Sequence, residues 1–130
     1  QLRAEDGALI YENVKKVLSK LFELGVSEWA VIHSPEGGFG MDKDGDYAVC
    51  GLVYTPSGFI KGKVGAGDAF CAGVLSAAHR GLSLLDAVKL GNAAATVSLR
   101  SPGATEAMET IEETMRICSE LGFEPVKLNK

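Results

Sequence analysis

The stretch Gly65-Ala66-Gly67-Asp68 is the part of the sequence best suited to chemistry. Two glycines one residue apart let the backbone turn tightly and bring its N–H groups close to a ligand. An apolar pattern with helical spacing begins directly afterwards. Asp68 is therefore expected at the N-terminus of a helix whose first N–H groups have no partner within the helix. Such a helix end is suited to binding anions, phosphate among them.

Two roles for Asp68 follow from this position. Its carboxylate can cap the helix by accepting a backbone hydrogen bond. Alternatively, it can act as a general base that takes a proton from the group attacking a bound phosphate. The spacing of the residues leaves both roles open.

Two common nucleotide-binding motifs are absent from this turn. Gly65 and Gly67 begin a GxGxxG pattern, but Phe70 stands at the position of the third glycine, so the dinucleotide-binding fingerprint fails. The sequence contains no GxxxxGK(S/T), which excludes a P-loop. An anion-binding turn with an aspartate at the start of a helix remains.

The composition is that of an ordinary globular domain or part of one. The 130 residues are 46% hydrophobic and 23% charged, with a net charge of −4. An acidic chain without a basic stripe is not expected to bind nucleic acid or an anionic membrane. Because no apolar run approaches a bilayer span and no signal peptide is recognisable, we expect a cytoplasmic protein. The chain begins at Gln1, which suggests a piece of a longer protein.

The side chains most often found in metal sites show no metal-binding pattern. Cys50, Cys71 and Cys118 are odd in number and lack CxxC spacing, so neither a disulfide framework nor a zinc site is expected. We expect all three to be small buried thiols. The acidic residues around Asp44-Gly45 fail the EF-hand pattern and are interpreted as turn residues.

The N-terminal half is expected to form a helix, a strand and a hairpin. Apolar residues recur at helical spacing from Ile10, and Gly25 is the expected stop. Residues 29–33 form a short apolar run typical of a strand covered on both faces, which favours a parallel sheet. Residues 34–38 are expected to form a loop. Asp44-Gly45 predicts a hairpin with a turn of two residues.

Three helices are expected in the C-terminal half. The first follows the glycine turn and ends at Gly81, and the second begins at Ser83, whose side chain is suited to capping a helix. A third helix carries four residues inward and ends before Gly122; they are Met108, Ile111, Met115 and Cys118. Residues 123–130 either add a short strand or trail. The whole pattern places the chain in the α/β class.

Asn92 lies on the apolar face of the second of these helices. A buried amide must find partners for its two N–H groups and its oxygen. It therefore either bonds neighbouring backbone or faces a ligand, and the sequence leaves both open.

Residues 64–75, VGAGDAFCAGVL, resemble the C-terminal signature of the ribokinase-like (PfkB) carbohydrate kinases, which is centred on D-T-x-G-A-G-D-x-F. The hairpin at Asp44-Gly45, the helix with residues 91–95 and the loop 101–104 follow in the family's order. The resemblance covers most of the chain. It implies the C-terminal part of a three-layer α/β/α sandwich, in which residues 1–130 are the nucleotide-binding part and the sugar-binding part and lid are missing.

The resemblance implies an ATP-dependent kinase that phosphorylates a hydroxyl of a sugar or similar small alcohol, with Mg²⁺ accompanying ATP. Asp68 would be the base, and the N–H groups of residues 65–67 (Gly65, Ala66, Gly67) would stabilise the transferring phosphoryl group. Asn92 would lie by the adenine, and the loop containing Gly103 and Ala104 would close the nucleotide region. A homodimer is compatible with the resemblance, and the fragment alone is expected to be inactive.

The sequence departs from the family pattern at two places. Gly62 and Lys63 stand where the family commonly has Asp and Thr, which leaves activation by a monovalent cation open. Lys63 could instead supply positive charge to the anion site. His33 and Pro35 replace the Thr and the first Gly of the T-x-G-x-x-G loop. The presence of Asp68 favours the kinase, whereas these departures lend weight to an alternative function, a non-catalytic nucleotide-binding or regulatory module of the same fold.

Overall fold

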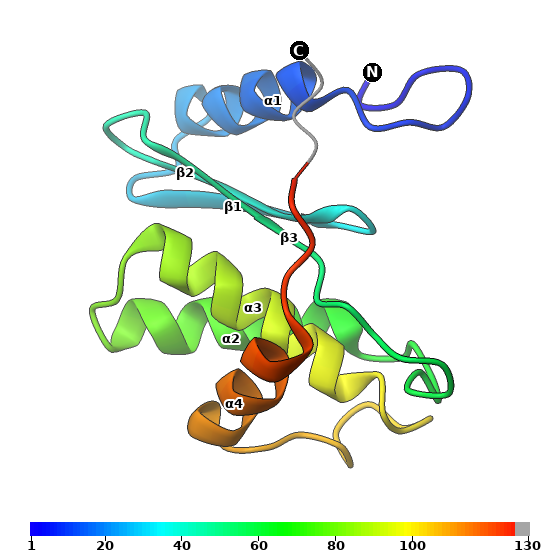
Figure 1. The fold of residues 1–130 in the computed structure, drawn as a ribbon. Coiled ribbons are helices and arrows are strands. Elements are labelled where there is room, and N and C mark those ends of the chain that lie inside the picture. Colours follow the sequence, from blue (N-terminus) through cyan, green and yellow to red (C-terminus); the bar gives the residue numbers. More distant parts are fainter. Residues whose placement is uncertain (127–130) are drawn as a thin grey trace.

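The structure, a computed structural model, describes residues 1–126. In chain order its elements are α1 (Tyr11–Glu23), β1 (Trp29–Ser34), β2 (Gly37–Asp42), β3 (Tyr47–Gly51), α2 (Ala66–His79), α3 (Leu84–Ser98) and α4 (Ile111–Leu121). They form three layers, with α1 on one face of the sheet and the other three helices on the opposite side (Figure 1). The layers confirm the predicted α/β class.

The three strands form one antiparallel sheet in the order β1-β2-β3. Ser34 pairs with Gly37 at one hairpin, and Met41 pairs with Tyr47 at the other. The expected parallel sheet is therefore wrong for these strands. Parallel neighbours need a crossover of a dozen or more residues, and these links are far shorter. Residues 34–38 are likewise not a free loop, because only Pro35 and Glu36 separate β1 from β2.

The hairpin predicted at Asp44-Gly45 is present, but its turn is longer than two residues. The Asp42 N–H donates to the oxygen of Asp46, and the Gly45 N–H donates to the oxygen of Asp42, both at 3.0 Å. Gly45 closes the turn at φ +84°, which is common in three-residue hairpin loops. Asp42 Oδ1 also accepts the N–H groups of Asp44 and Asp46 at 2.9 Å each. This carboxylate thus stabilises the turn itself.

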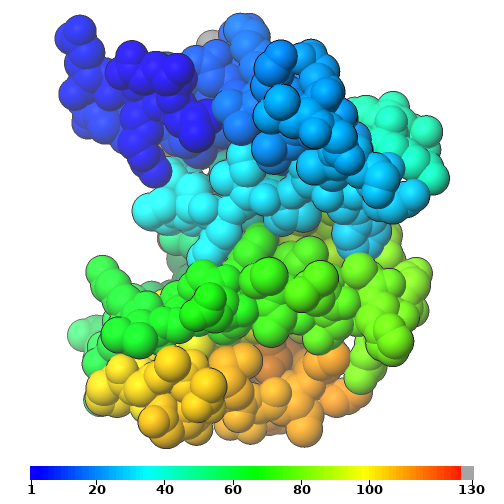
Figure 2. All heavy atoms as spheres, turned by 180° about the vertical axis from the view of Figure 1, so that it is seen from behind, coloured from blue at the N-terminus to red at the C-terminus, as the bar shows by residue number. Residues whose placement is uncertain are grey.

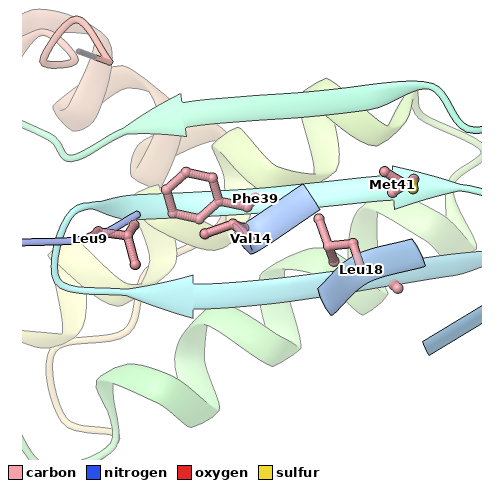
Figure 3. Close-up of a cluster of buried hydrophobic side chains, with 6 residues drawn as sticks. Leu9, Val14, Leu18, Phe39 and Met41 are labelled. Carbon is pink, nitrogen blue, oxygen red and sulfur yellow. The ribbon is translucent and has the colours of Figure 1, made fainter. Parts of the chain in front are cut away.

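An apolar cluster lies between α1 and the sheet (Figure 3). Its buried members come from α1, the segment before it, and strands β1 and β2; they are Leu9, Val14, Leu18, Ala30, Phe39 and Met41. The ring of Tyr11 meets that of Phe39 edge to face, with centroids 5.8 Å apart. Burial of this stripe confirms the amphipathic helix that the spacing from Ile10 predicts.

The helix ends agree with the sequence pattern except at α4. Gly25 follows the last turn of α1, and Ser83 caps α3 by accepting the N–H of Asp86 at 3.1 Å. The last helix begins only at Ile111, because Thr110 caps it and accepts the N–H of Glu113 at 3.2 Å. The expectation that Met108 is an inward helix residue is therefore wrong, since it precedes α4 and is exposed.

The C-terminal segment runs back toward the sheet after α4 (Figure 1). Phe123 pairs with Val53 in an isolated antiparallel bridge, so this part of the predicted tail is extended. Residues 127–130 of the predicted tail and domain lie outside the described residues.

Candidate active site

The glycine turn forms the start of α2. The helix begins at Ala66, and Gly65 is its N-cap in the left-handed conformation, with φ +83°. No side chain caps this helix, and Asp68 is its third residue. The interpretation of Asp68 as an N-cap is therefore wrong. Its side chain is exposed, and within residues 1–126 it takes part in no hydrogen bond or ion pair. The carboxylate thus faces solvent.

The backbone N–H groups at the start of α2 are also available. The Ala66 N–H donates a long hydrogen bond to the oxygen of Lys63 at 3.5 Å, and the Ala69 N–H donates to the oxygen of Gly65 at 2.8 Å. In the described part of the chain, the N–H groups of Gly67 and Asp68 have no backbone acceptor. A Cβ added at Gly67 would meet nothing within 4 Å, so this side of the turn is open. Free N–H groups beside open space are suited to an anion such as phosphate.

The loop 101–104 lies more than thirty residues after the glycine turn in sequence but packs against it in the fold. The N–H groups of Lys61 and Gly62 both donate to the oxygen of Leu99, at 2.7 and 3.2 Å. A Cβ at Gly65 would lie 2.9 Å from the Cβ of Ala104. The structure therefore brings together the predicted site residues from Lys63 to Asp68 and those of the loop, Gly103 and Ala104.

Gly62 has a packing role that the sequence did not reveal. A Cβ at this position would lie 2.6 Å from the Cα of Pro102 and 2.9 Å from the oxygen of Ser101. Gly62, which stands in place of the family's Asp, thus lets the backbone of the loop 101–104 pack closely against it. No local sequence signal could identify this contact, because the two segments meet only in the fold.

Asn92 bonds neighbouring backbone, one of the two alternatives that the sequence left open. Its side chain is 2% exposed. Its Nδ2 donates to the oxygens of Cys50 and Gly51 at 2.9 Å each, while the buried Oδ1 has no partner among the described residues. Asn92 therefore ties α3 to the end of β3. Its predicted place near the adenine stays a prediction.

Replacing Asn92 by Ala is expected to lower the free energy of unfolding by about 2–4 kcal/mol, because two buried carbonyls lose their donor and a cavity forms. Urea denaturation followed through the fluorescence of Trp29 measures this. Asn13→Ala is the matched control, since among residues 1–126 the Asn13 amide donates only to the oxygen of Gln1, in an exposed hydrogen bond. It should cost less than about 0.5 kcal/mol. Equal losses for the two variants would contradict the structural role.

Phe70 anchors α2 between the sheet and α3. Its ring stacks on that of His33, with centroids 4.2 Å apart and planes 2° from parallel. A Cβ at Gly38 or at Gly91 would come within 2.9 Å of this ring, so both glycines leave room for it. Desolvation of the stacked ring lowers the pKa of His33 below its usual range, which favours the neutral imidazole. His33 thus contacts α2 through its ring, an aromatic contact that the family's Thr could not make.

Within residues 1–126, no group of three or more His, Cys, Asp or Glu side chains is placed to hold a metal ion. A Mg²⁺ ion that arrives with a nucleotide usually keeps phosphate oxygens and waters and needs only one or two protein carboxylates. The free N–H groups of α2 and the exposed Asp68 carboxylate fit a phosphate with such an ion.

Comparison with known proteins identifies the family. Residues 4–111 match the pfkB family carbohydrate kinases. The chain belongs to this family. It is also 37% identical over 81 residues to the 2-dehydro-3-deoxygluconokinase of Bacillus subtilis (strain 168), a match that covers 56% of this chain and 24% of that enzyme. The chain therefore spans about a quarter of this relative.

Solved structures of ribokinase-like enzymes share the fold. Phosphofructokinase-2 from Escherichia coli in complex with potassium is similar over 93% of this chain and 36% of its own, with a TM-score of 0.68 and 21% identity. Arabidopsis thaliana ribokinase complexed with ribose and ATP is similar over 83% of this chain and 34% of its own, with a TM-score of 0.71 and 20% identity. The chain is thus an α/β fragment of the ribokinase-like fold. None of its described helices is both long and apolar enough to span a membrane.

Proposed function

We propose that the chain is the C-terminal, nucleotide-binding part of an ATP-dependent kinase that phosphorylates a hydroxyl of a sugar or related small alcohol. The observation that carries the proposal is the exposed, unpaired Asp68 carboxylate beside free N–H groups at the start of α2. Membership of a carbohydrate kinase family supports it. A base next to an anion site is the combination that phosphoryl transfer to a hydroxyl requires.

In the proposed reaction, Asp68 accepts the proton of the attacking sugar hydroxyl. The oxygen of that hydroxyl forms a bond to the γ-phosphorus of ATP, the bond to the bridging oxygen breaks, and ADP leaves with the electron pair. The N–H groups of Gly65, Ala66 and Gly67 would stabilise charge on the phosphoryl oxygens. Mg²⁺ would neutralise phosphate charge when bound with ATP.

The remaining predicted residues would bind the nucleotide. Gly103 and Ala104 lie in the loop that packs on Gly65, so this loop can close over a nucleotide bound at the turn. The exposed Lys63 precedes the turn and would add positive charge. Asn92 would hold the end of β3 in place through its two hydrogen bonds, and the adenine would lie nearby.

The β1–β2 hairpin favours a second candidate, a module that binds nucleotide without catalysis. Here Pro35 and Glu36 form a tight turn, and Glu36 pairs with Arg3 at 2.6 Å. The guanidinium of Arg3 holds the pKa of Glu36 below its usual range. A closed turn with a carboxylate is unlike a glycine-rich loop that contacts a nucleotide through its backbone.

A chimaera distinguishes the two candidates. Residues 1–130 replace the matching segment of the Bacillus subtilis 2-dehydro-3-deoxygluconokinase, and the protein is incubated with ATP, Mg²⁺ and a panel that includes 2-dehydro-3-deoxygluconate and ribose. Mass spectrometry of the sugars and calorimetric titration with ATP are the measurements. A phosphorylated sugar supports the kinase. Nucleotide binding with no phosphorylated product for any sugar would instead support the module.

A further inference from the structure

Gly62 occupies a position where the family commonly has a cation ligand. Ribokinase-like kinases have Asp there, and the family pattern associates that Asp with a monovalent cation. The Escherichia coli phosphofructokinase-2 that shares the fold was solved in complex with potassium. Whether such an ion fits this chain depends on the atoms around Gly62.

The backbone around Gly62 leaves no room for the carboxylate. A Cβ at this position would lie 2.6 Å from the Cα of Pro102 and 2.9 Å from the oxygen of Ser101. Both neighbours are backbone atoms, so no change of side-chain rotamer can relieve the contact. The view from behind shows the loop near residue 100, in yellow, directly against the green segment that leads into α2 (Figure 2). An Asp at position 62 would therefore push the loop 101–104 away from the turn.

The oxygen of Leu99 beside Gly62 is already in use. A monovalent cation bound in a protein is held by several oxygens that replace its hydration shell. The Leu99 oxygen accepts the N–H groups of Lys61 and Gly62 at 2.7 and 3.2 Å, which occupies both of its lone pairs. Position 62 itself offers only neutral backbone. The residues at this place do not fit a bound potassium ion.

Lys63, the next residue, brings a positive charge to the start of the glycine turn. The Ala66 N–H donates to the oxygen of Lys63 at 3.5 Å, so residues 63–66 form a turn. The Cα atoms at the two ends of such a turn lie within about 7 Å of each other. Ala66 is also the first residue of α2. The ammonium of Lys63, on its flexible stem, can therefore reach an anion bound at this helix end.

The charge of Lys63 is not engaged elsewhere in the described structure. The side chain is exposed, and among residues 1–126 no acidic side chain forms an ion pair with it. Arg100, at the start of the loop, differs in this respect. Its guanidinium pairs with Glu109 at 2.9 Å and donates to the oxygen of Ala107 at 2.8 Å. Lys63 can thus turn toward a phosphate without breaking an ion pair.

We propose that the ammonium of Lys63 replaces the monovalent cation, so that this chain binds ATP without potassium. Gly62 and Lys63 then act as a pair of linked departures from the family pattern. The glycine lets the loop 101–104 close onto the turn, and the lysine supplies a fixed positive charge near the phosphates. The inference rests on the nucleotide site of the proposed function, but it is tested by binding and requires no phosphorylated sugar.

Calorimetric titration with ATP and Mg²⁺ tests the independence from potassium. The chain and the chimaera are each titrated in potassium chloride and in tetramethylammonium chloride of equal ionic strength. Because general screening is then the same, ATP affinity should agree within about twofold between the two salts. The Escherichia coli phosphofructokinase-2 is the positive control, since it was solved in complex with potassium. Its thermal midpoint should be higher in potassium chloride, which shows that tetramethylammonium does not substitute for the ion.

Variants of Lys63 test the source of the charge. Lys63→Met keeps an apolar stem and should weaken ATP binding by about tenfold in either salt, because a charge-assisted contact is lost. Lys63→Arg should largely retain the affinity. Lys16→Met is the matched control, since it changes the net charge equally but lies on α1, where Lys16 forms an exposed pair with Glu12. It should alter ATP affinity by less than about twofold.

Three results would overturn the inference. The first is an ATP affinity about tenfold or more higher in potassium than in tetramethylammonium. If Glu106→Gln abolished that difference, the exposed acid whose carboxylate lies against Gly103 would be the ligand of the ion. The second is equal affinity in Lys63→Met and Lys16→Met. The third is no ATP binding in either salt, which would also overturn the proposed function. Binding without a phosphorylated product would remove the kinase function alone, so the two proposals can fail separately.

Discussion

Replacing Asp68 by Asn in the chimaera should reduce turnover by about 10²- to 10⁴-fold, the usual contribution of a general base. The amide has nearly the shape of the carboxylate but cannot take the proton of the sugar hydroxyl. The side chain is exposed and unpaired in the described structure, so its replacement breaks no contact of the fold. ATP affinity should therefore persist, and removal of a negative charge beside the phosphates can even raise it. Initial rates and calorimetric titration measure the two quantities.

Asp86→Asn provides a matched control. Asp86 lies in the first turn of α3 as Asp68 lies in the first turn of α2, and both carboxylates are exposed. Each therefore interacts with the positive end of a helix dipole, so their replacement should cost similar, small amounts of stability. Only Asp68→Asn should reduce turnover by this factor. Retained activity in Asp68→Asn, or an equal loss in both variants, would contradict the assignment of Asp68 as the base.

The sequence predicted the helices well because their signals are local. Ser83 before an apolar pattern and Gly25 after one mark helix ends through hydrogen bonds and backbone angles within a few residues. The antiparallel direction of the strands was missed because it has no such local signal. Residues 29–33 have the composition of a buried strand, but their neighbour in the sheet is set by Pro35 and Glu36, whose two-residue turn resembles an ordinary loop in sequence.

The candidate site was predicted only where its residues are contiguous. The glycine turn and Asp68 lie within four residues, so their chemistry could be inferred directly. The contacts of Gly62 with Pro102 and of His33 with Phe70 join segments far apart in sequence, and no periodicity reports on such pairs. Cys71 is exposed, contrary to the expectation of three buried thiols, because sequence alone does not show which side of an apolar helix faces solvent.

Gly65→Ala should weaken ATP binding by about tenfold or more and lower stability as well. Gly65 has φ +83°, a conformation that costs a residue with a side chain roughly 1–2 kcal/mol. The new methyl group would also lie 2.9 Å from the Cβ and 3.0 Å from the backbone of Ala104. Either the turn or the loop 101–104 must move, which displaces N–H groups that are proposed to hold phosphate. Calorimetric titration with ATP and urea denaturation measure the two effects.

Two further glycine variants separate stability from binding. Gly45→Ala introduces the same backbone strain, at φ +84°, but its methyl group meets nothing within 4 Å. It should lower stability by a similar amount and leave ATP affinity unchanged. Gly67→Ala is the opposite case, because an alanine in the first turn of α2 favours the helix while its methyl group enters the open space beside the free N–H groups. It should raise stability by up to about 1 kcal/mol and still weaken ATP binding. If affinity instead followed stability through all three variants, the glycines would serve the fold alone, and the phosphate would bind elsewhere.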